Sequence, residues 1–396
     1  MEQPKGFIEK SISHLVCKLQ KSLYGLKHAP HSWFEKLYES LIDLGFTSAK
    51  SDQSLFTRFT MDHTTFLLVY VDHILVTGNN PSVIQQLISQ LNKSFSFKDL
   101  GEIDYFLGIQ VKHITEGLHL SQTKYVHDLL CKAKMNNANG MNTPMISGQQ
   151  LTASGSGTVQ DIQLYKSVVC ALQYVTITRP EISFCVNRVC QYLKDPQEEH
   201  WQAVKRILRY LKNTIQYGLH LTYSSTLNLV GFCDADWASS PYDRRSTFGY
   251  CVYLGNNLVS WCSKKQHIVS RSSIEAEYRS LAGITAKITW LTALLSELRL
   301  TLPRTPAVWC DNLSIVLLSA NPILHARTKH IELDLYFVRE KVIQKLIDVR
   351  HVPSSDQIAD LFTKAIPSSR FSLLRSKLRV LDLSTLSLRE DVRIIK

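Results

Sequence analysis

Apolar residues in the first third of the chain follow both helical and strand spacing. One helical stretch stops at Gly45, and Pro81 opens another. Two short apolar runs flank Asp72, which predicts a hairpin with this acid at its tip. The pattern predicts helices over Ala29–Leu44, Pro81–Leu91 and Lys124–Met135, and strands over Thr65–Tyr70, Ile74–Thr77, Tyr105–His113 and Leu118–Ser121.

A segment rich in Asn, Gly and Ser separates this part from the next helices. Residues 136–157 show little periodicity, which predicts a linker. Helical spacing resumes over Tyr165–Tyr192 and again over Glu198–Lys212. The latter helix carries a basic face made by Lys205, Arg206, Arg209 and Lys212. This face is either the solvated side of an amphipathic surface helix or a track for a phosphate backbone.

The second half has an informative order of elements. Three strands come first, followed by a long helix, a strand, two helices, a strand and a last helix. The predicted strands are Leu227–Asp234, Phe248–Leu254, Leu258–Ser263, Ala307–Asp311 and Ile347–Val352, and the predicted helices are Ile274–Leu298, Leu313–Ser319, Ile331–Lys345 and Asp356–Lys364. This succession is typical of a mixed sheet flanked by helices.

Four acids lie at or beside the ends of these elements. They are Asp234, Glu277, Asp311 and Asp360. Ser272 and Glu275 match a capping box, so Glu275 has a structural role at the start of the long helix. Glu277 lies about 200° further around that helix, near its apolar face, where an unpaired carboxylate is costly.

Carboxylates that converge on one spot repel each other unless a cation joins them. Magnesium prefers oxygen ligands, and a pair of such ions suits phosphodiester hydrolysis. The alternative assigns each acid a local role: Asp311 as a helix cap, Asp360 as a surface acid and Asp234 as a turn residue. Spacing alone does not separate the two interpretations.

Composition adds a partner class. Apolar residues make up 44% of the 396 residues, and the net charge is +11 with a pI of about 9.1. Such a balance favours a polyanionic partner, although a basic protein without a nucleic-acid role remains an alternative. The nine cysteines form no C-x-x-C pair, so we expect reduced thiols in an intracellular protein and no zinc site. No signal peptide or membrane span is predicted.

Long sequence blocks carry a resemblance to a known family. They include KSLYGLKHAPHSWFEKL, LLVYVDHILVTG, FKDLGEIDYFLGIQV, TRPEISFCVNRV, AVKRILRYLK, FCDADWASSPYDRRSTFGY, VSWCSKKQ, SRSSIEAEYRSLA, WCDNLSI, HARTKHIELD and QIADLFTK. Over residues 1–378 the chain resembles the Pol polyprotein of copia-type long-terminal-repeat retrotransposons. The resemblance implies an α+β chain, with a partial reverse-transcriptase palm and helical thumb followed by a ribonuclease H-like five-stranded mixed sheet flanked by helices.

In the second half, the resemblance implies a ribonuclease H domain that cleaves the RNA of an RNA–DNA hybrid with Mg²⁺, or alternatively Mn²⁺. The family's four metal-binding acids fall on Asp234, Glu277, Asp311 and Asp360. Asp236 and Glu275 rank lower. His351 resembles a mobile histidine that helps product release in related domains, with an ordinary edge-strand histidine as the alternative.

In the first half, the resemblance implies a polymerase whose paired acids lie in a YVDD hairpin. This chain has Asp72 followed by His73, so the second acid is missing. An earlier acid-bearing strand of the family would precede the QPKGF stretch with which this chain starts. We therefore expect a fragment that does not synthesise DNA by itself. Integrase and protease motifs do not occur in the sequence.

These observations predict four regions: a partial palm over 1–120, thumb or connection helices over 121–225 with the linker 136–157, a ribonuclease H domain over 226–366 and a tail over 367–396. The leading hypothesis is a hybrid ribonuclease with the polymerase remnant as a nucleic-acid-holding platform. The alternative is a non-catalytic, nucleic-acid-binding relic. Candidate partners include upstream portions of the polyprotein, and no membrane partner is expected. The sequence determines neither the oligomeric state nor whether the protein resides in a cytoplasmic particle or in the nucleus.

Overall fold

The computed structural model describes residues 29–71, 73–152, 157–320 and 332–386, together with Gly6, Leu15 and Val16. The chain divides into two compact units, the first made of Met1–Asp99 with Ala293–Leu300, and the second made of Leu100–Thr292 with Thr301–Lys396. No helix among the described residues is long and apolar enough to cross a membrane.

The first unit is an antiparallel four-stranded sheet packed with two helices. Its elements are α1 (Ala29–Asp43), β1 (Thr47–Ser48), β2 (Leu55–Phe59), β3 (Thr64–Tyr70), β4 (His73–Gly78) and α2 (Pro81–Ser94). The predicted hairpin is confirmed, and its register pairs Tyr70 with His73. Buried Leu37 and Leu41 of α1 share a core with Phe56 and Leu67 of the sheet.

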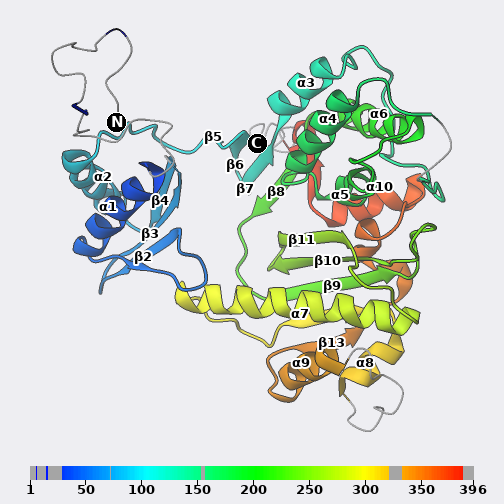
Figure 1. Cartoon of the computed structure of the whole chain (residues 1–396). Coiled ribbons are helices and arrows are strands. Elements are labelled where there is room, and N and C mark those ends of the chain that lie inside the picture. The colour runs from blue at the N-terminus through cyan, green and yellow to red at the C-terminus, as the bar shows by residue number, and fades with distance from the viewer. Residues whose placement is uncertain are drawn as a thin grey trace, which may run out of the picture. The chain divides into compact units, whose positions relative to one another are not determined.

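The second unit contains two five-stranded sheets (Figure 1). One sheet has the order β14-β8-β7-β6-β5 and is antiparallel throughout. Its strands are β5 (Tyr105–Phe106), β6 (Ile109–Ile114), β7 (Gly117–Ser121), β8 (Tyr217–Thr222) and β14 (Val380–Asp382). The helices that come between or next to these strands in the sequence are α3 (Thr123–Lys132), α4 (Ile162–Val175), η2 (Pro180–Ile182), α5 (Ser183–Cys190), α6 (Glu198–Asn213) and α10 (Ser368–Lys377). The sequence patterns missed β8 and β14, whose pairing joins segments about 160 residues apart.

The other sheet has the order β11-β10-β9-β12-β13, with the first three strands antiparallel and the last two parallel to β9. Its strands are β9 (Leu229–Asp236), β10 (Thr247–Leu254), β11 (Asn257–Lys265), β12 (Ala307–Cys310) and β13 (Asp348–His351). The accompanying helices are α7 (Ser273–Glu297), α8 (Leu313–Ala320), α9 (Glu332–Ile343), η5 (Ser354–Asp356) and η6 (Ile358–Phe362). The predicted order of elements in this half is confirmed.

Helical layers cover both faces of this mixed sheet. Buried residues of α7, among them Leu281 and Ile284, share one core with Cys233 and Val252 of the strands. The opposite side packs against α5 and η6, where Phe362 belongs to the larger core. Each residue of a buried strand therefore has a defined layer to face, which fixes the direction of acids at the strand ends.

The helical spacing over Tyr165–Tyr192 corresponds to two helices. α4 ends at Val175, and α5 follows a 3₁₀ turn that starts at Pro180, because proline disfavours helical geometry in the residue before it. One predicted helix is wrong in detail. The helix expected over Asp356–Lys364 is instead two short 3₁₀ segments, η5 and η6. Ile331 and residues 153–156 of the expected linker lie outside the described residues, as does the tail after Leu386.

Candidate metal centre

Asp234 lies on the central strand of the mixed sheet. It pairs with Gly249 of β10, and its side chain is almost completely buried at 5% exposure. Ser280 of α7 donates its hydroxyl hydrogen to the carbonyl oxygen of Asp234 at 2.9 Å. Strand pairing on one side and the helix on the other therefore fix the backbone that carries this carboxylate.

Asp360 reaches the same place from η6, more than 120 residues later. Close packing of η6 on β10 depends on Gly249, because a Cβ atom built there would lie 2.4 Å from the Cβ of Phe362. Real non-bonded carbon atoms keep about 3.5–4.0 Å apart. The missing side chain of Gly249 thus allows the segment that carries Asp360 to approach the strand that carries Asp234.

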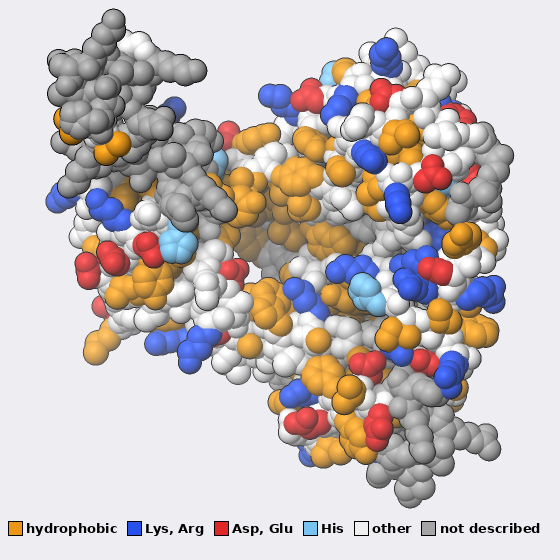
Figure 2. Space-filling view, in the orientation of Figure 1, with side chains coloured by type: hydrophobic (Ala, Val, Ile, Leu, Met, Phe, Trp, Pro, Cys, Tyr) orange, Lys and Arg blue, Asp and Glu red, His pale blue; other side chains and the backbone are white. Residues whose placement is uncertain are grey.

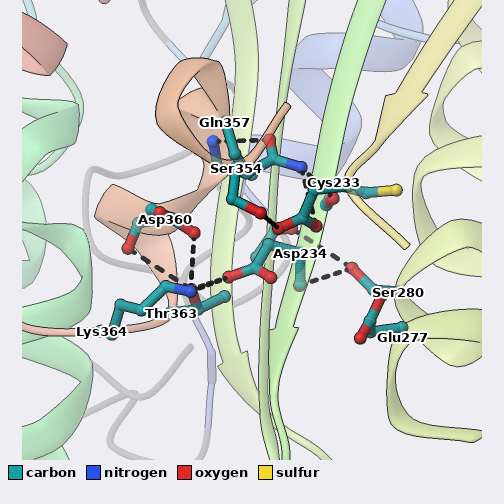
Figure 3. Close-up of polar contacts among 12 residues, drawn as sticks. Cys233, Asp234, Glu277, Ser280, Ser354, Gln357, Asp360, Thr363 and Lys364 are labelled. Carbon is teal, nitrogen blue, oxygen red and sulfur yellow. Dashed lines mark hydrogen bonds and ion pairs between the residues drawn. The ribbon is translucent and has the colours of Figure 1, made fainter. Parts of the chain in front are cut away.

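The four predicted acids converge through Asp311. Ligand oxygens of Asp234, Asp311 and Asp360 lie within 4.8 Å of one another, and an oxygen of Asp311 forms an equally close group with Glu277 and the thiol of Cys310. Asp311 follows β12 directly and accepts a hydrogen bond from Ser354 Oγ at 3.1 Å. Figure 3 shows Asp234 between the acid of η6 and that of α7.

Glu277 is held on its own side of the centre. Asn312 Nδ2 donates to Glu277 Oε1 at 3.1 Å, and Cys310 Sγ lies 3.8 Å from Oε2. Burial raises the pKa of Glu277 to about 7, an effect that the Asn312 hydrogen bond opposes and the charge of Asp311 reinforces. Burial likewise raises the pKa of Asp234. Both carboxylates are therefore in surroundings where a cation favours the ionised form.

Glu275 has a different job from Glu277. Its backbone N–H donates to Ser272 Oγ at 3.2 Å, and its carboxylate accepts from the Arg271 backbone N–H and from Arg279 Nη2, both at 2.8 Å. These bonds serve the start of α7. The helical phase separates the two acids as the sequence indicated.

Two cations contact the carboxylates. Lys364 Nζ lies 2.8 Å from Asp360 Oδ1 and 3.5 Å from Asp234 Oδ2 (Figure 3). Arg370 Nη2 lies 2.6 Å from Asp360 Oδ2, and the Thr363 hydroxyl donates to Asp234 Oδ2. Burial alone would lower the pKa of Lys364, but the two acids outweigh it and raise the pKa.

Sequence reasoning missed these two cations. Lys364 follows Asp360 by four residues, a spacing that signals an ion pair only where helical geometry holds. Arg370 carried no such signal, because its position depends on how α10 packs. Gln357 was missed as well: its Nε2 donates to the carbonyl oxygen of Cys233 at 3.0 Å, which ties η6 to the central strand.

The remaining predicted residues lie in several places. Asp236 ends β9 two residues after Asp234. Burial raises the pKa of Asp236, an effect that the charge of Lys364 opposes and that of Asp234 reinforces. His351 is the last residue of β13 and pairs in register with Cys310, one position before Asp311. His73 is exposed at the start of β4. Asp72 lies outside the described residues.

The basic residues of α6 contact the segment expected to be a linker. Arg209 Nε donates to the carbonyl oxygen of Asn139 and Lys212 Nζ to that of Ala138, each at 2.7 Å. Arg206 Nη2 donates to the hydroxyl of Thr143 at 2.9 Å. Residues 138–143 thus lie along α6, so part of its basic face is used within the molecule.

Comparisons with known proteins give the chain its family. Residues 1–147 match the family described as "Reverse transcriptase (RNA-dependent DNA polymerase)". The chain is 45% identical over 380 residues to the "Retrovirus-related Pol polyprotein from transposon RE1" of Arabidopsis thaliana. The matched region covers 96% of this chain but only 26% of that protein. The chain is 32% identical over 281 residues to the "Putative transposon Ty5-1 protein YCL074W" of Saccharomyces cerevisiae, which covers 70% of this chain and 91% of that protein.

The chain therefore belongs to the copia-type retrotransposon Pol family, and the predicted resemblance is confirmed. It spans about a quarter of the length of the full Pol polyproteins that it matches. Among solved structures, the foamy viral protease-reverse transcriptase in complex with an RNA/DNA hybrid is similar at 13% identity and a TM-score of 0.45, covering 87% of this chain and 40% of that one.

Proposed function

We propose that residues 226–366 form a ribonuclease H domain that hydrolyses the RNA strand of RNA–DNA hybrids. One observation carries the proposal: the oxygens of Asp234, Asp311 and Asp360 lie within 4.8 Å of one another, next to Glu277. Two neighbouring strands, β9 and β12, and two helical segments, α7 and η6, bring these acids together at the carboxyl ends of the strands.

The donor set fits two hard divalent cations. It offers carboxylate oxygens, which Mg²⁺ prefers and Mn²⁺ accepts. Burial raises the pKa of Asp234 and Glu277, so ionised carboxylates here are stabilised by added positive charge. One ion of the pair would be held by Asp234, Asp311 and Asp360. The other would be held by Glu277 and Asp311.

Residues around the acidic cluster have distinct roles in the proposed reaction. When bound, two divalent ions supply an activated water and stabilise the leaving oxygen of the phosphodiester. Asn312 orients Glu277, while Ser354 and Gln357 orient Asp311. His351, beside Cys310 in the sheet, would assist product release. Recognition of the hybrid would use backbone shape and 2′-hydroxyl groups rather than base sequence.

The experiment supplies the purified chain with Mg²⁺ and a labelled RNA–DNA hybrid. Asp234→Asn and Glu277→Gln should each lower cleavage by at least about 100-fold, because each removes a charged ligand. Asp236→Asn is the matched control: it removes an acid two residues along the same strand and should retain cleavage. Equal loss in all three variants contradicts the assignment of the acids.

A non-catalytic role is the competing outcome of the same test. If the parent and the variants all bind the hybrid with equal affinity and none cleaves it, the chain is a nucleic-acid-binding relic. The basic balance of the chain supports binding in either case.

For the first unit we propose an inactive polymerase site that serves as a nucleic-acid-holding platform. The chain has Asp72 followed by His73 where the family places two acids. A histidine is neutral or cationic near neutral pH and offers no carboxylate oxygen to Mg²⁺. Polymerase chemistry depends on positioned metal ions, so the loss of one acid removes a ligand that the reaction needs.

A further inference from the structure

A cavity of about 420 Å³ lies between α6 and the segment that follows α3. Lys205, Arg206 and Arg209 of α6 line one side, and Ile146 and Gln149 of the facing segment line the other. Its volume falls in the range of about 300–1,000 Å³ that small-molecule sites occupy. The metal centre uses none of these residues.

The cavity concentrates positive charge. Three cationic side chains line it, and one of them, Lys205, forms an ion pair with Glu198 at 3.7 Å. Burial lowers the pKa of Arg206, and the neighbouring charge of Arg209 lowers it further. Figure 2 shows Lys and Arg side chains interspersed with acidic, hydrophobic and other side chains on the face drawn. An anion in this cavity would relieve the repulsion between the two guanidinium groups.

Two of the residues that line the cavity each have a buried polar side-chain atom with no hydrogen-bond partner within the described part of the chain. These atoms are Arg206 Nε, a cationic donor, and Gln149 Oε1, a neutral acceptor. Buried polar groups in folded proteins are almost always hydrogen-bonded, so these atoms mark two unmet hydrogen bonds beside the cavity. A buried donor on α6, which favours an anion, and a buried acceptor on the facing segment, which favours an N–H group, thus belong to residues that line the same cavity.

The lining also has an apolar part. Met135, Ala138, Ile146 and Ala203 contribute to it. Inorganic phosphate would use only the cationic wall, whereas a nucleotide combines a phosphate with a planar base that can lie on apolar side chains and donate an amino hydrogen. The lining therefore matches a nucleotide better than a simple anion.

We propose that this cavity binds one nucleotide of a single-stranded nucleic acid, with its phosphate on Arg206 and Arg209 and its base near Ile146 and Gln149. The site goes beyond the ribonuclease: it needs neither a hybrid nor a metal ion. It would hold a strand at a second point, away from the metal centre.

The test measures binding of a labelled eight-nucleotide RNA to the full chain by fluorescence anisotropy in EDTA. Arg209→Gln and Arg206→Gln should each weaken binding by about 10-fold or more, because charge-assisted hydrogen bonds to phosphate are lost. The slope of log affinity against log salt should fall by about 0.7 for each lost phosphate contact. Adenosine monophosphate, and inorganic phosphate separately, serve as competitors to distinguish a free nucleotide from a strand phosphate.

Lys212→Gln is the matched control. Lys212 lies on the same helix and donates to the same segment, but it does not line the cavity. It should leave affinity within about twofold of the parent, because its ammonium already donates to the Ala138 carbonyl oxygen and lies outside the cavity lining. Gln149→Leu changes no charge and tests the cavity if Arg206→Gln fails to fold; it should weaken RNA binding without altering the salt slope.

The proposal is overturned if Arg209→Gln and Gln149→Leu bind RNA like the parent, or if Lys212→Gln weakens binding as much as they do. Displacement of RNA by adenosine monophosphate supports a nucleotide site open to free ligand. Resistance to that competitor, with loss of binding in Arg209→Gln, supports a site for strand phosphates. Hybrid cleavage can fail without changing any of these results, so the two proposals are tested separately.

Discussion

Gly249→Ala tests how the metal centre is assembled. The added methyl group would lie 2.4 Å from Phe362 Cβ and 3.0 Å from the carbonyl carbon and oxygen of Phe362. An ordinary carbon contact needs about 3.5 Å, so η6 must withdraw by about 1 Å. Two of the three close atoms belong to the backbone, which has no rotamer with which to avoid the clash.

Overpacking of this kind costs about 1–3 kcal/mol. A movement of about 1 Å is also about a fifth of the 4.8 Å within which the oxygens of Asp234, Asp311 and Asp360 lie, which is enough to disturb a metal site. Gly249→Ala should therefore lower the free energy of unfolding by about 1–3 kcal/mol and weaken Mn²⁺ binding. Urea denaturation in EDTA measures the first effect, and electron paramagnetic resonance of free Mn²⁺ measures the second.

Gly283→Ala provides the matched control. A Cβ atom at Gly283 would lie 3.5 Å from Phe248 Cε2, an ordinary contact, in the middle of α7. Alanine at such a helical position stabilises by about 0.5–1 kcal/mol. If Gly249→Ala proves as stable as the parent and binds Mn²⁺ as tightly, close approach of η6 to β10 does not position Asp360.

Three further predictions concern charge and chemistry. Lys364→Gln removes a cation from buried Asp234. Because Lys364 is 42% exposed, we expect the free energy of unfolding in EDTA to fall by only about 1–3 kcal/mol, and Mn²⁺ to bind more tightly. Lys377→Gln, the control at an exposed ion pair, should change the free energy of unfolding by less than about 0.5 kcal/mol. The pKa of Glu277 is raised to about 7, so its contribution to metal-free stability is fully present below about pH 4.5 and lost as pH rises through 7; Glu277→Gln should flatten this part of the stability–pH curve, and an unchanged curve would contradict the shift. With His73 at the polymerase hairpin, the parent should not extend a primer on an RNA template, and extension would refute the account of the first unit.

Local sequence patterns determined much of this protein. Strand and helix periods located the order of elements around Asp234, and the helical phase assigned Glu275 to the start of α7 and Glu277 to the acidic cluster. These inferences succeed because periodicity and capping depend on residues a few positions apart. The family blocks then indicated which acids to compare.

Only the tertiary structure decided what lies between distant segments. The contacts of Lys364 and Arg370 with the acids, the pairing of β14 with β8 and the cavity beside α6 all join residues far apart in the sequence. Such contacts follow from the packing of whole layers, and no short window of residues encodes that packing. The sequence by itself thus determined the local elements and the candidate ligands, whereas long-range packing decided which charges meet.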